Sequence, residues 1–437
     1  MRDVILHAFN WRYADIATRA NAIAIAGYGA VLFPPPLWSD ENGQEWWQVY
    51  QPKDYRILRS HLGRKADLVD AIDKLKVAGV RAIADVVFNH MANESRPDRF
   101  QFPGKDALAR YATDPTFLED RLYGDLSQGL FTEHDFHPDK NIDDWTDHEQ
   151  VVDAQLSGLP DITLSIAVVQ EQIQCLTELV NIGFDGFRVD AVKHLPVEQV
   201  TAVFQSNPTD GKFVFGETLT FDSSQNAEFL WPVVKATRIS YYDFPLQQTL
   251  KSAFAMGGSL RELVDPASVG NALPWSRAVT FTVTHDIPNN DGFRGMLLDT
   301  QDEYLANAYV LGRDGGVPMV YSDHAESAAS HPEDRGRWEE CWNRSDIAAM
   351  VGFHNAVEGL PQRSLWEDDG FFVFARGDRA IVAINKTSDW ASPEISTPGL
   401  QWGGYRCQIH RSLMQVQGDT FRFAIPPREV QMWLREG

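Results

Sequence analysis

The stretch GFDGFRVDAVKH, residues 183–194, carries charged side chains through a segment that otherwise has the pattern of a buried β-strand. Side chains two positions apart share one face of a strand, so Arg188 and Asp190 point the same way. Phe187 and Val189 point the opposite way, where covering helices would bury them. In a barrel of parallel strands, the charged pair would face the axis at the carboxyl end, where such folds carry their chemistry.

Seven further segments share this apolar, β-branched character, and amphipathic helical stretches separate them. The clearest helical pattern is LVDAIDKLKVAG (68–79), where Gly79 marks the end of the helix. Eight strands in a βα repeat predict an α/β fold, the (β/α)8 TIM barrel. The predicted strands are VILHAF (4–9), AVLF (30–33), RAIADVVF (81–88), FDGFRVD (184–190), KFVFGE (212–217), RISYYD (238–243), AVTFTV (278–283) and VPMVY (317–321).

The repeat is interrupted twice, and each interruption predicts a further domain. The third and fourth strands lie much further apart than the roughly 30 residues of one βα unit, so a loop-rich segment, residues 91–162, is inserted after strand three. After about residue 360 the helical pattern gives way to alternating strands. We therefore expect a barrel formed by residues 1–90 and 163–358, an inserted domain at 91–162, and a C-terminal antiparallel β domain at 359–437.

The composition excludes several classes of partner. The chain has 437 residues, 61 Asp and Glu against 39 Lys and Arg, and a formal net charge of −22. This acidic excess repels phosphate backbones and anionic lipid headgroups, so we expect neither nucleic acid nor a membrane as partner. We expect a monomer.

The cysteines and the N-terminal segment bear on the cellular compartment in which the protein acts. Cys175, Cys341 and Cys407 lie far apart in the sequence, which predicts neither a disulfide framework nor a cysteine metal site. The start, MRDVILHAFNW, has an apolar run too short for a secretion signal, and it fits a first strand better. The absence of a signal peptide favours the cytoplasm, whereas prior removal of a signal would make the protein secreted.

Four acidic residues fall at the ends of predicted strands: Asp85, Asp190, Glu217 and Asp286. A single acid at a strand end is usually a helix cap or a solvated loop residue. Four that converge on one barrel mouth favour chemistry instead, and Asp190 and Glu217 are one βα unit apart, on neighbouring strands. Two carboxyl groups in different environments are what glycoside hydrolysis uses. A structural ion pair of Arg188 with Asp85 or Asp190 is compatible with that role.

Five short motifs resemble, in order, those of the α-amylase family of glycoside hydrolases (family 13 type). They are DVVFNH (85–90), GLPD (158–161), GFRVDAVKH (186–194), GE (216–217) and HD (285–286). The resemblance covers the barrel, the insertion and the C-terminal domain. It implies that Asp190 is the nucleophile, Glu217 the general acid and base, and Asp286 a third acid that holds sugar hydroxyls. In that scheme Glu217 needs a raised pKa, while Arg188 keeps Asp190 ionised.

The resemblance also implies where substrate and metal bind. Adjacent tryptophans are often simply packed, but the segment EWWQVYQP (45–52) resembles a substrate loop of the family, and Trp47 and Tyr50 are its favoured sugar contacts. The implied substrate-binding residues are Trp46, Trp47, Tyr50, Gln51, Asp85, His90, Arg188, Lys193 and His285. The implied cofactor is Ca²⁺, with Asn89, Asp161 and the carbonyl of His194 as ligands, and with Asp147, Glu149 or Asp153 as candidates to complete the shell. The alternative is that Asn89 caps its loop and Asp161 starts a helix.

The resemblance therefore predicts a retaining α-1,4-glucan hydrolase that acts on starch, glycogen or maltooligosaccharides. A transglycosylase or an exo-acting, maltooligosaccharide-forming enzyme of the family is the first alternative. An inactive glucan-binding protein on the same fold is the second, although the presence of all three acids argues against it. Thr284 and Met319 stand where chloride-activated members have Asn and Arg, so the sequence gives no indication of chloride dependence.

Overall fold

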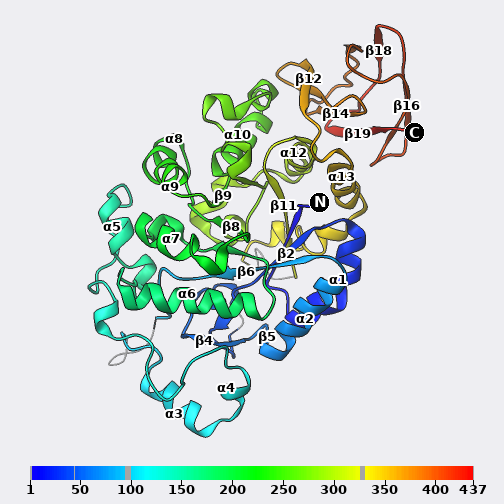
Figure 1. Cartoon of the computed structure of the whole chain (residues 1–437). Helices are drawn as coiled ribbons and strands as arrows, with labels where there is room; N and C mark the ends of the chain where they lie inside the picture. The colour runs from blue at the N-terminus through cyan, green and yellow to red at the C-terminus, as the bar shows by residue number, and fades with distance from the viewer. Residues whose placement is uncertain (1, 44, 94–99, 325–329, 437) are drawn as a thin grey trace. The chain divides into compact units, whose positions relative to one another are not determined.

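A computed structural model describes residues 2–43, 45–93, 100–324 and 330–436. Its main sheet is a closed barrel of eight strands in the order β1-β11-β10-β9-β8-β7-β6-β2, and all eight predicted strands are confirmed (Figure 1). The strands are β1 (Ile5–Phe9), β2 (Ala30–Phe33), β6 (Arg81–Val86), β7 (Gly186–Val189), β8 (Phe213–Gly216), β9 (Ser240–Tyr242), β10 (Ala278–Thr280) and β11 (Val317–Asp323). The seventh predicted strand was too long, because β10 ends at Thr280 rather than at residue 283.

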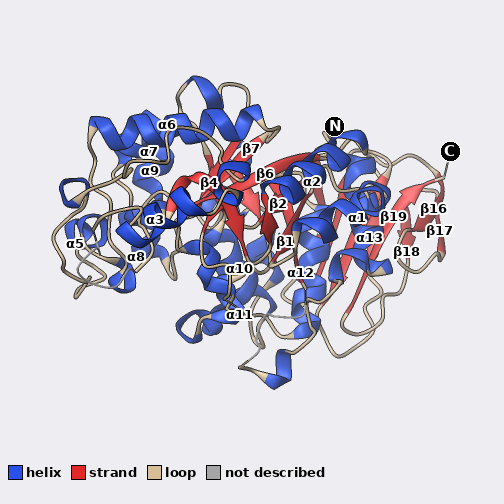
Figure 2. Ribbon diagram, turned by 90° about the horizontal axis from the view of Figure 1, so that it is seen from below, coloured by secondary structure: helices blue, strands red, loops and turns tan. Residues whose placement is uncertain are grey.

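Helices follow the strands as the βα repeat predicts (Figure 2). Helix α2 (Lys65–Val77) buries Leu68, Ile72 and Leu75 on one face, and Gly79 follows it with φ +76°, a conformation that glycine adopts without strain. The other principal helices between barrel strands are α1 (Tyr13–Ala26), α6 (Ile166–Asn181), α7 (Val197–Phe204), α9 (Trp231–Ala236), α10 (Phe244–Phe254) and α12 (Thr300–Gly312). In the described ranges, no helix is both long enough and apolar enough to cross a membrane. The three cysteines are free and buried.

The chain divides into two compact units, and each contributes part of the barrel. One unit consists of Met1–His7, Ile25–Gly29 and Asp243–Gly437, and the other of Ala8–Ala24 and Ala30–Tyr242. The second unit contains the parallel strands β2, β6, β7, β8 and β9. The first contains the parallel pair β10 and β11. The boundaries of the three domains expected from the sequence stay a prediction.

The insertion after β6 is largely loop, as predicted, with short helices. These are α3 (Lys105–Thr113), α4 (Thr116–Glu119) and α5 (His148–Asp153). The segment between β2 and α2 also holds a three-stranded sheet that was not predicted from the sequence. Its strands are β3 (Leu37–Trp38), β4 (Asp54–Ser60) and β5 (Gly63–Arg64). Trp38, Ile57, Tyr111 and Phe117 form a common apolar cluster. This small core joins the insertion to the β3–β5 sheet.

The C-terminal part is antiparallel, as predicted. Six strands pair in the order β12-β13-β14-β19-β16-β17, and β15 (Glu394–Ser396) pairs separately with β18 (Thr420–Arg422). The six are β12 (Gln362–Glu367), β13 (Phe371–Arg376), β14 (Ala380–Asn385), β16 (Gly403–Cys407), β17 (Leu413–Val416) and β19 (Glu429–Arg435). Gly377, in the turn between β13 and β14, has φ +56°.

Arg376 fixes this sheet to two helices of the same unit. The side chain is 2% exposed, and it donates to the carbonyl oxygens of Leu360, Gly312, Arg313 and Val357. Two of these carbonyls end α12 and α13 (Ser345–Val357), where helices leave carbonyl groups without intrahelical partners. Burial lowers the pKa of Arg376 to about 10.

The N-terminal segments of this unit are bound to its C-terminal half. Asp3 lies 2.9 Å from Nε2 of His354 in α13, and Asn355 donates to the carbonyl oxygen of Gly27 at 2.9 Å. The hydroxyl of Tyr28 donates to the carbonyl oxygen of Trp342 at 3.0 Å. Residues separated by more than 300 positions are therefore directly hydrogen-bonded.

Candidate active site

Arg188 joins three acidic side chains on neighbouring strands. Asp85 on β6 pairs in register with Arg188 on β7, so the two side chains lie at the same level of the sheet. Nη1 of Arg188 lies 2.8 and 3.0 Å from the two carboxylate oxygens of Asp85 and 2.7 Å from Oδ1 of Asp190. Nη2 lies 2.7 Å from Oε1 of Glu217. One guanidinium thus holds both residues expected to do the chemistry.

The strands place Asp190 and Glu217 through their backbones. The amide of Asp190 donates to Val86 at 3.0 Å, and the amide of Glu217 donates to Val189 at 2.9 Å, so each acid continues the pairing of the strand before it. Gly216 precedes Glu217 because a Cβ there would lie 2.8 Å from a methyl group of Val192. Close packing therefore explains the glycine of the GE motif. The backbone pairing of Glu217 explains where its carboxyl group lies.

Burial and the charge of Arg188 shift the pKa values of Asp85 and Asp190 in opposite directions. Burial raises the pKa of Asp85 to about 7, with Arg188 acting in the opposite direction. Burial also raises the pKa of Asp190, and the charge and hydrogen bond of Arg188 lower it. Although burial disfavours the charged guanidinium, the three surrounding acids raise the pKa of Arg188. Arg188 thus acts on Asp190 in the expected sense, but desolvation is the larger effect. The raised pKa of Glu217 stays a prediction.

The predicted substrate loop contributes Tyr50 directly to the acid cluster. Tyr50 ends a short 3-10 helix, η1 (Trp46–Tyr50), and its hydroxyl donates to Oδ2 of Asp85 at 3.0 Å. Nε2 of His90 lies 3.0 Å from the carbonyl oxygen of Tyr50, and burial lowers the pKa of His90 to about 4, which keeps its ring neutral near pH 7. Trp47 is 42% exposed, whereas the half-buried Trp46 packs against Tyr50 with ring centroids 6.2 Å apart. Trp47 therefore offers an open aromatic face.

Lys193 lies among residues that the sequence did not single out. Its Nζ is 3.3 Å from Oε1 of Gln225 and 4.6 Å from the ring centroid of Phe229. Burial lowers the pKa of Lys193 to about 8. Gln51, the polar residue of the predicted substrate loop, directly follows η1 and is partly exposed.

Asp286 and His285 belong to the other compact unit. Asp286 begins the single-turn helix α11 (Asp286–Asn289). Its Oδ2 lies 3.4 Å from Nε2 of His285, and its Oδ1 accepts a hydrogen bond from Nδ2 of Asn290 at 2.9 Å. The ring of His285 packs edge-on against His7, 5.4 Å between centroids. Asn290 was not predicted from the sequence, although its position four residues after an acid at a helix start was a usable signal.

The predicted metal ligands Asn89 and Asp161 come together. Nδ2 of Asn89 lies 3.1 Å from Oδ1 of Asp161, and burial raises the pKa of Asp161 to about 7. A buried carboxylate suits a hard cation, which would offset the cost of burying the charge, although the group of Asn89 that faces it in this structure is the amide nitrogen and not the amide oxygen. His137 was not predicted, yet its Nδ1 lies 2.6 Å from Oδ2 of Asp161. The ring of His194 contacts the carbonyl oxygen of Val151 at 2.8 Å.

The acids proposed to complete the metal shell have other surroundings. Asp147 caps α5 by accepting hydrogen bonds from the amides of Glu149 and Gln150. Glu149 is exposed, and Asp153 has an oxygen 3.8 Å from Nε2 of His137. Within the part of the chain that the structure describes, no three acidic, histidine or cysteine side chains form a metal cluster. Any calcium shell would therefore need carbonyl oxygens and water.

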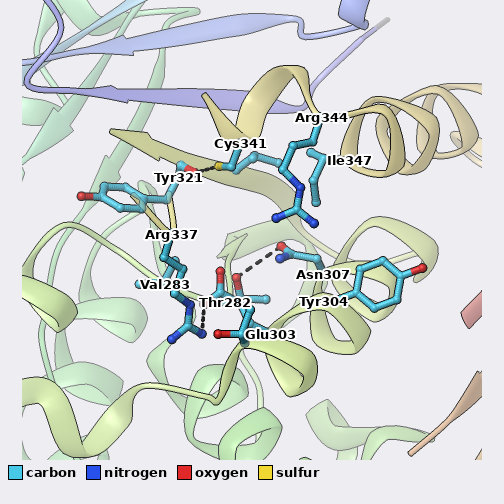
Figure 3. Close-up of a pocket in the computed structure, with 12 residues that line it drawn as sticks. Thr282, Val283, Glu303, Tyr304, Asn307, Tyr321, Arg337, Cys341, Arg344 and Ile347 are labelled. Atoms are coloured by element: carbon cyan, nitrogen blue, oxygen red, sulfur yellow. Dashed lines mark hydrogen bonds and ion pairs between the residues drawn. The ribbon is translucent and has the colours of Figure 1, made fainter. Parts of the chain in front are cut away.

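A cavity of about 30 Å³ lies elsewhere, lined by residues of β11, α12, α13 and the segment after β10 (Figure 3). Ion pairing of Arg337 with Glu303 at 2.6 Å and a hydrogen bond from Thr282 to Asn307 at 3.2 Å close its walls. The thiol of Cys341 donates to the carbonyl oxygen of Tyr321. The cavity has room for a water molecule and no predicted site residue lines it, so it is not a sugar site.

Comparisons with known proteins agree with the motifs. The family model described as "Alpha amylase, catalytic domain" matches residues 31–246. An alpha-amylase of Aeromonas hydrophila is 42% identical over 98% of this chain and 94% of its own length, and one of Thermomonospora curvata is 29% identical over 97% and 72%. A mutant alpha-amylase I of Eisenia fetida, solved with maltohexaose, superposes with a TM-score of 0.80 at 22% identity, covering 99% of this chain and 97% of that one.

Proposed function

The chain belongs to the alpha-amylase family of glycoside hydrolases, and from this premise we propose that it hydrolyses α-1,4-glucosidic bonds with retention of configuration. The proposed substrates are starch, glycogen and maltooligosaccharides. The observation that carries the proposal is the single guanidinium of Arg188, within 2.7 Å of both Asp190 and Glu217. A nucleophile and an acid held by one group on neighbouring strands suit a double displacement.

In the proposed reaction, Asp190 attacks the anomeric carbon while Glu217 donates its proton to the leaving glycosidic oxygen. The bond from the anomeric carbon to that oxygen breaks as the bond to Asp190 forms, giving a covalent glycosyl-enzyme. Water then attacks the same carbon, Glu217 accepts a proton from the water, and Asp190 is released. Asp286 holds sugar hydroxyls, with Tyr50 and Trp47 as aromatic contacts and His90 and His285 as hydrogen-bonding groups.

We also propose that Ca²⁺ stabilises the insertion. Asn89 follows β6 and Asp161 lies at the end of the insertion, 72 positions later, so a cation on both would join the two ends of the inserted segment. The carbonyl of His194 is the third proposed ligand. The ion would act on stability and on the shape of the cleft, and it takes no part in bond making or breaking.

The test compares Asp190→Asn and Glu217→Gln with wild type on a labelled maltooligosaccharide series. We expect each variant to fold and to lose more than about 10³-fold in kcat. Asp185→Asn is the matched control, because Asp185 precedes the same strand but accepts a hydrogen bond from the amide of Ala82, at 3.3 Å, and not from Arg188. Substantial turnover by Asp190→Asn would reject the nucleophile assignment.

The products separate the alternatives. An α-configured first product, observed by proton NMR, supports retention, and a β-configured one contradicts it. Products longer than the substrate would indicate transfer, and a single product length would indicate exo action. Binding of maltooligosaccharides without turnover would identify an inactive glucan-binding protein.

A further inference from the structure

Asn290 is in direct contact with the third acid. Its Nδ2 donates to Oδ1 of Asp286 at 2.9 Å, while Nε2 of His285 lies 3.4 Å from Oδ2. A carboxylate turns readily about its last bond, so contacts to both oxygens restrict that rotation. We propose that Asn290 is a positioning residue that fixes the carboxylate plane of Asp286 for binding of sugar hydroxyls. This inference rests on the proposed hydrolysis.

The backbone of Asn290 is itself fixed on both sides. Its amide donates to the carbonyl oxygen of Asp286 at 3.0 Å, and its carbonyl oxygen accepts from the amide of Phe293 at 2.9 Å. Residues four apart on one helical turn share a face, which brings the amide side chain over the carboxylate. At Asn290 the chain turns to an extended conformation, φ −115° and ψ 119°, so α11 ends at this residue. The contact is therefore built into the end of the turn.

Side chains outside α11 also hold this turn in place. Arg294 donates to the carbonyl oxygen of Pro288 within α11 at 2.9 Å and to Oδ2 of Asp334 at 2.5 Å. Asp334 also pairs with Arg337 at 3.2 Å, and Arg337 pairs with Glu303 of α12 at 2.6 Å. These charged groups connect the loop after β10 with the loop after β11 and with a barrel helix. The position of Asn290 is thus supported by a rigid surrounding.

An amide suits this position better than a carboxyl group. A neutral N–H donor stabilises the ionised form of Asp286, which is the form that accepts hydrogen bonds from sugar hydroxyls. A second carboxylate of the same size would repel Asp286 while both are ionised. Once that carboxyl group takes a proton, it can donate to Asp286 as the amide does. Asn290→Asp therefore makes the positioning contact dependent on pH, and Asn290→Ala removes it at every pH.

The experiment measures kcat and KM of wild type, Asn290→Ala, Asn290→Asp and Asp286→Asn on maltoheptaose from pH 4 to 8. We expect Asn290→Ala to lose roughly tenfold to a hundredfold in kcat/KM at all pH values, because small misplacements of reacting or binding groups cost about that much. Asn290→Asp should lose at least as much at pH 8 and recover relative to Asn290→Ala as the pH falls. Asn271→Ala, at an exposed asparagine of the same unit, should match wild type.

Melting temperatures and circular dichroism accompany each assay. If Asn290→Ala does not fold, the ratio of Asn290→Asp to wild type across the pH range decides alone. A ratio that stays constant with pH, or an Asn290→Ala variant with wild-type kcat/KM, overturns the inference. If that happens while Asp286→Asn is inactive, the proposed hydrolysis stands and only the role of Asn290 fails. A wild-type protein that does not cleave maltoheptaose overturns both.

Discussion

Arg188 shows how one residue can serve structure and chemistry together. Its side chain is completely buried, and it neutralises part of the charge of Asp85, Asp190 and Glu217. A planar guanidinium can contact three carboxyl groups from two of its nitrogens, which a lysine ammonium cannot do with the same geometry. The structural ion pair and the catalytic arrangement are here the same set of contacts.

We therefore expect Arg188→Lys to impair both stability and activity. Losing contacts to buried acids should lower the free energy of unfolding by roughly 3–5 kcal/mol and kcat by at least about a hundredfold. Chemical denaturation and steady-state kinetics measure the two effects. Arg422→Lys is the control, since Arg422 is 66% exposed and its partner Glu394 is 53% exposed. A variant of Arg188 with wild-type kcat would contradict the central role given to its guanidinium.

At the residue scale, the sequence predicted contacts between residues of the motifs. It missed contacts between a motif residue and a loop residue far from it in the sequence. Arg188 and Asp190 were expected together because strand periodicity puts them on one face, and Asp85 was expected near them because it ends a strand at the same barrel mouth. The structure brings the three together. Asp185 had no assigned role, and the structure gives it one in pairing the start of β7 with β6. His137 was missed because 24 positions of loop separate it from Asp161, and no periodicity predicts which loop residues meet.

At the scale of elements, the eight barrel strands were predictable because each is a short apolar run buried on both faces. The β3–β5 sheet was not, since β3 and β5 have only two residues each and are held by the apolar cluster around Trp38. Asp243, which ends the predicted strand at 238–243, in fact caps α10.

Asp243 makes the stability of α10 depend on pH. Its Oδ1 accepts hydrogen bonds from the amides of Leu246 and Leu273, and burial raises its pKa to about 6. The folded protein therefore keeps a proton that the unfolded chain releases at about pH 4, so this group's contribution to stability falls as the pH rises from 4 to 6. Above pH 6 the buried charge costs about 3 kcal/mol.

We expect Asp243→Asn to keep the cap and remove the charge. Its melting temperature should exceed that of wild type at pH 8, and the difference should shrink as the pH falls to 4. Melting curves measured across that range check the prediction. Asp243→Ala, which leaves both amides without their acceptor, should be less stable than the equally uncharged Asp243→Asn by about 1–3 kcal/mol at every pH. A difference between Asp243→Asn and wild type that grows at low pH would show the sign to be wrong.

At the scale of the whole molecule, the proposed calcium ion joins distant parts of the chain. We expect a chelator to lower the melting temperature of wild type by on the order of 5 °C, because a ligand that binds only the folded state stabilises it. Asp161→Asn removes the carboxylate and should be insensitive to the chelator. Scanning calorimetry with and without added Ca²⁺ measures both.

His137 provides the competing explanation within the same experiment. If the hydrogen bond from His137 to Asp161 stabilises the insertion without a metal, the chelator will have no effect, and His137→Ala will lower the melting temperature of wild type by itself. That outcome would reject the calcium proposal and would leave the assignment of the catalytic acids unchanged.

The general organisation of the molecule was visible in the sequence, because strand spacing reveals an insertion and a change of periodicity reveals a second kind of sheet. The grouping into compact units was not visible. It depends on contacts such as those of Arg376, a residue inside an apolar strand pattern whose side chain binds carbonyl groups of two helices. Composition and spacing carry no information about such contacts.

The composition of the unit that contains both chain ends has a consequence for synthesis. Residues 1–7 and 25–29 leave the ribosome long before their partners in residues 243–437 exist. At about 5–20 residues per second, translation needs tens of seconds to reach His354 and Asn355, which bind Asp3 and Gly27. During that time Asp3 and Gly27 lack these partners, so the contacts that hold the N-terminal segments to the rest of their unit form only after residues 354 and 355 have been synthesised.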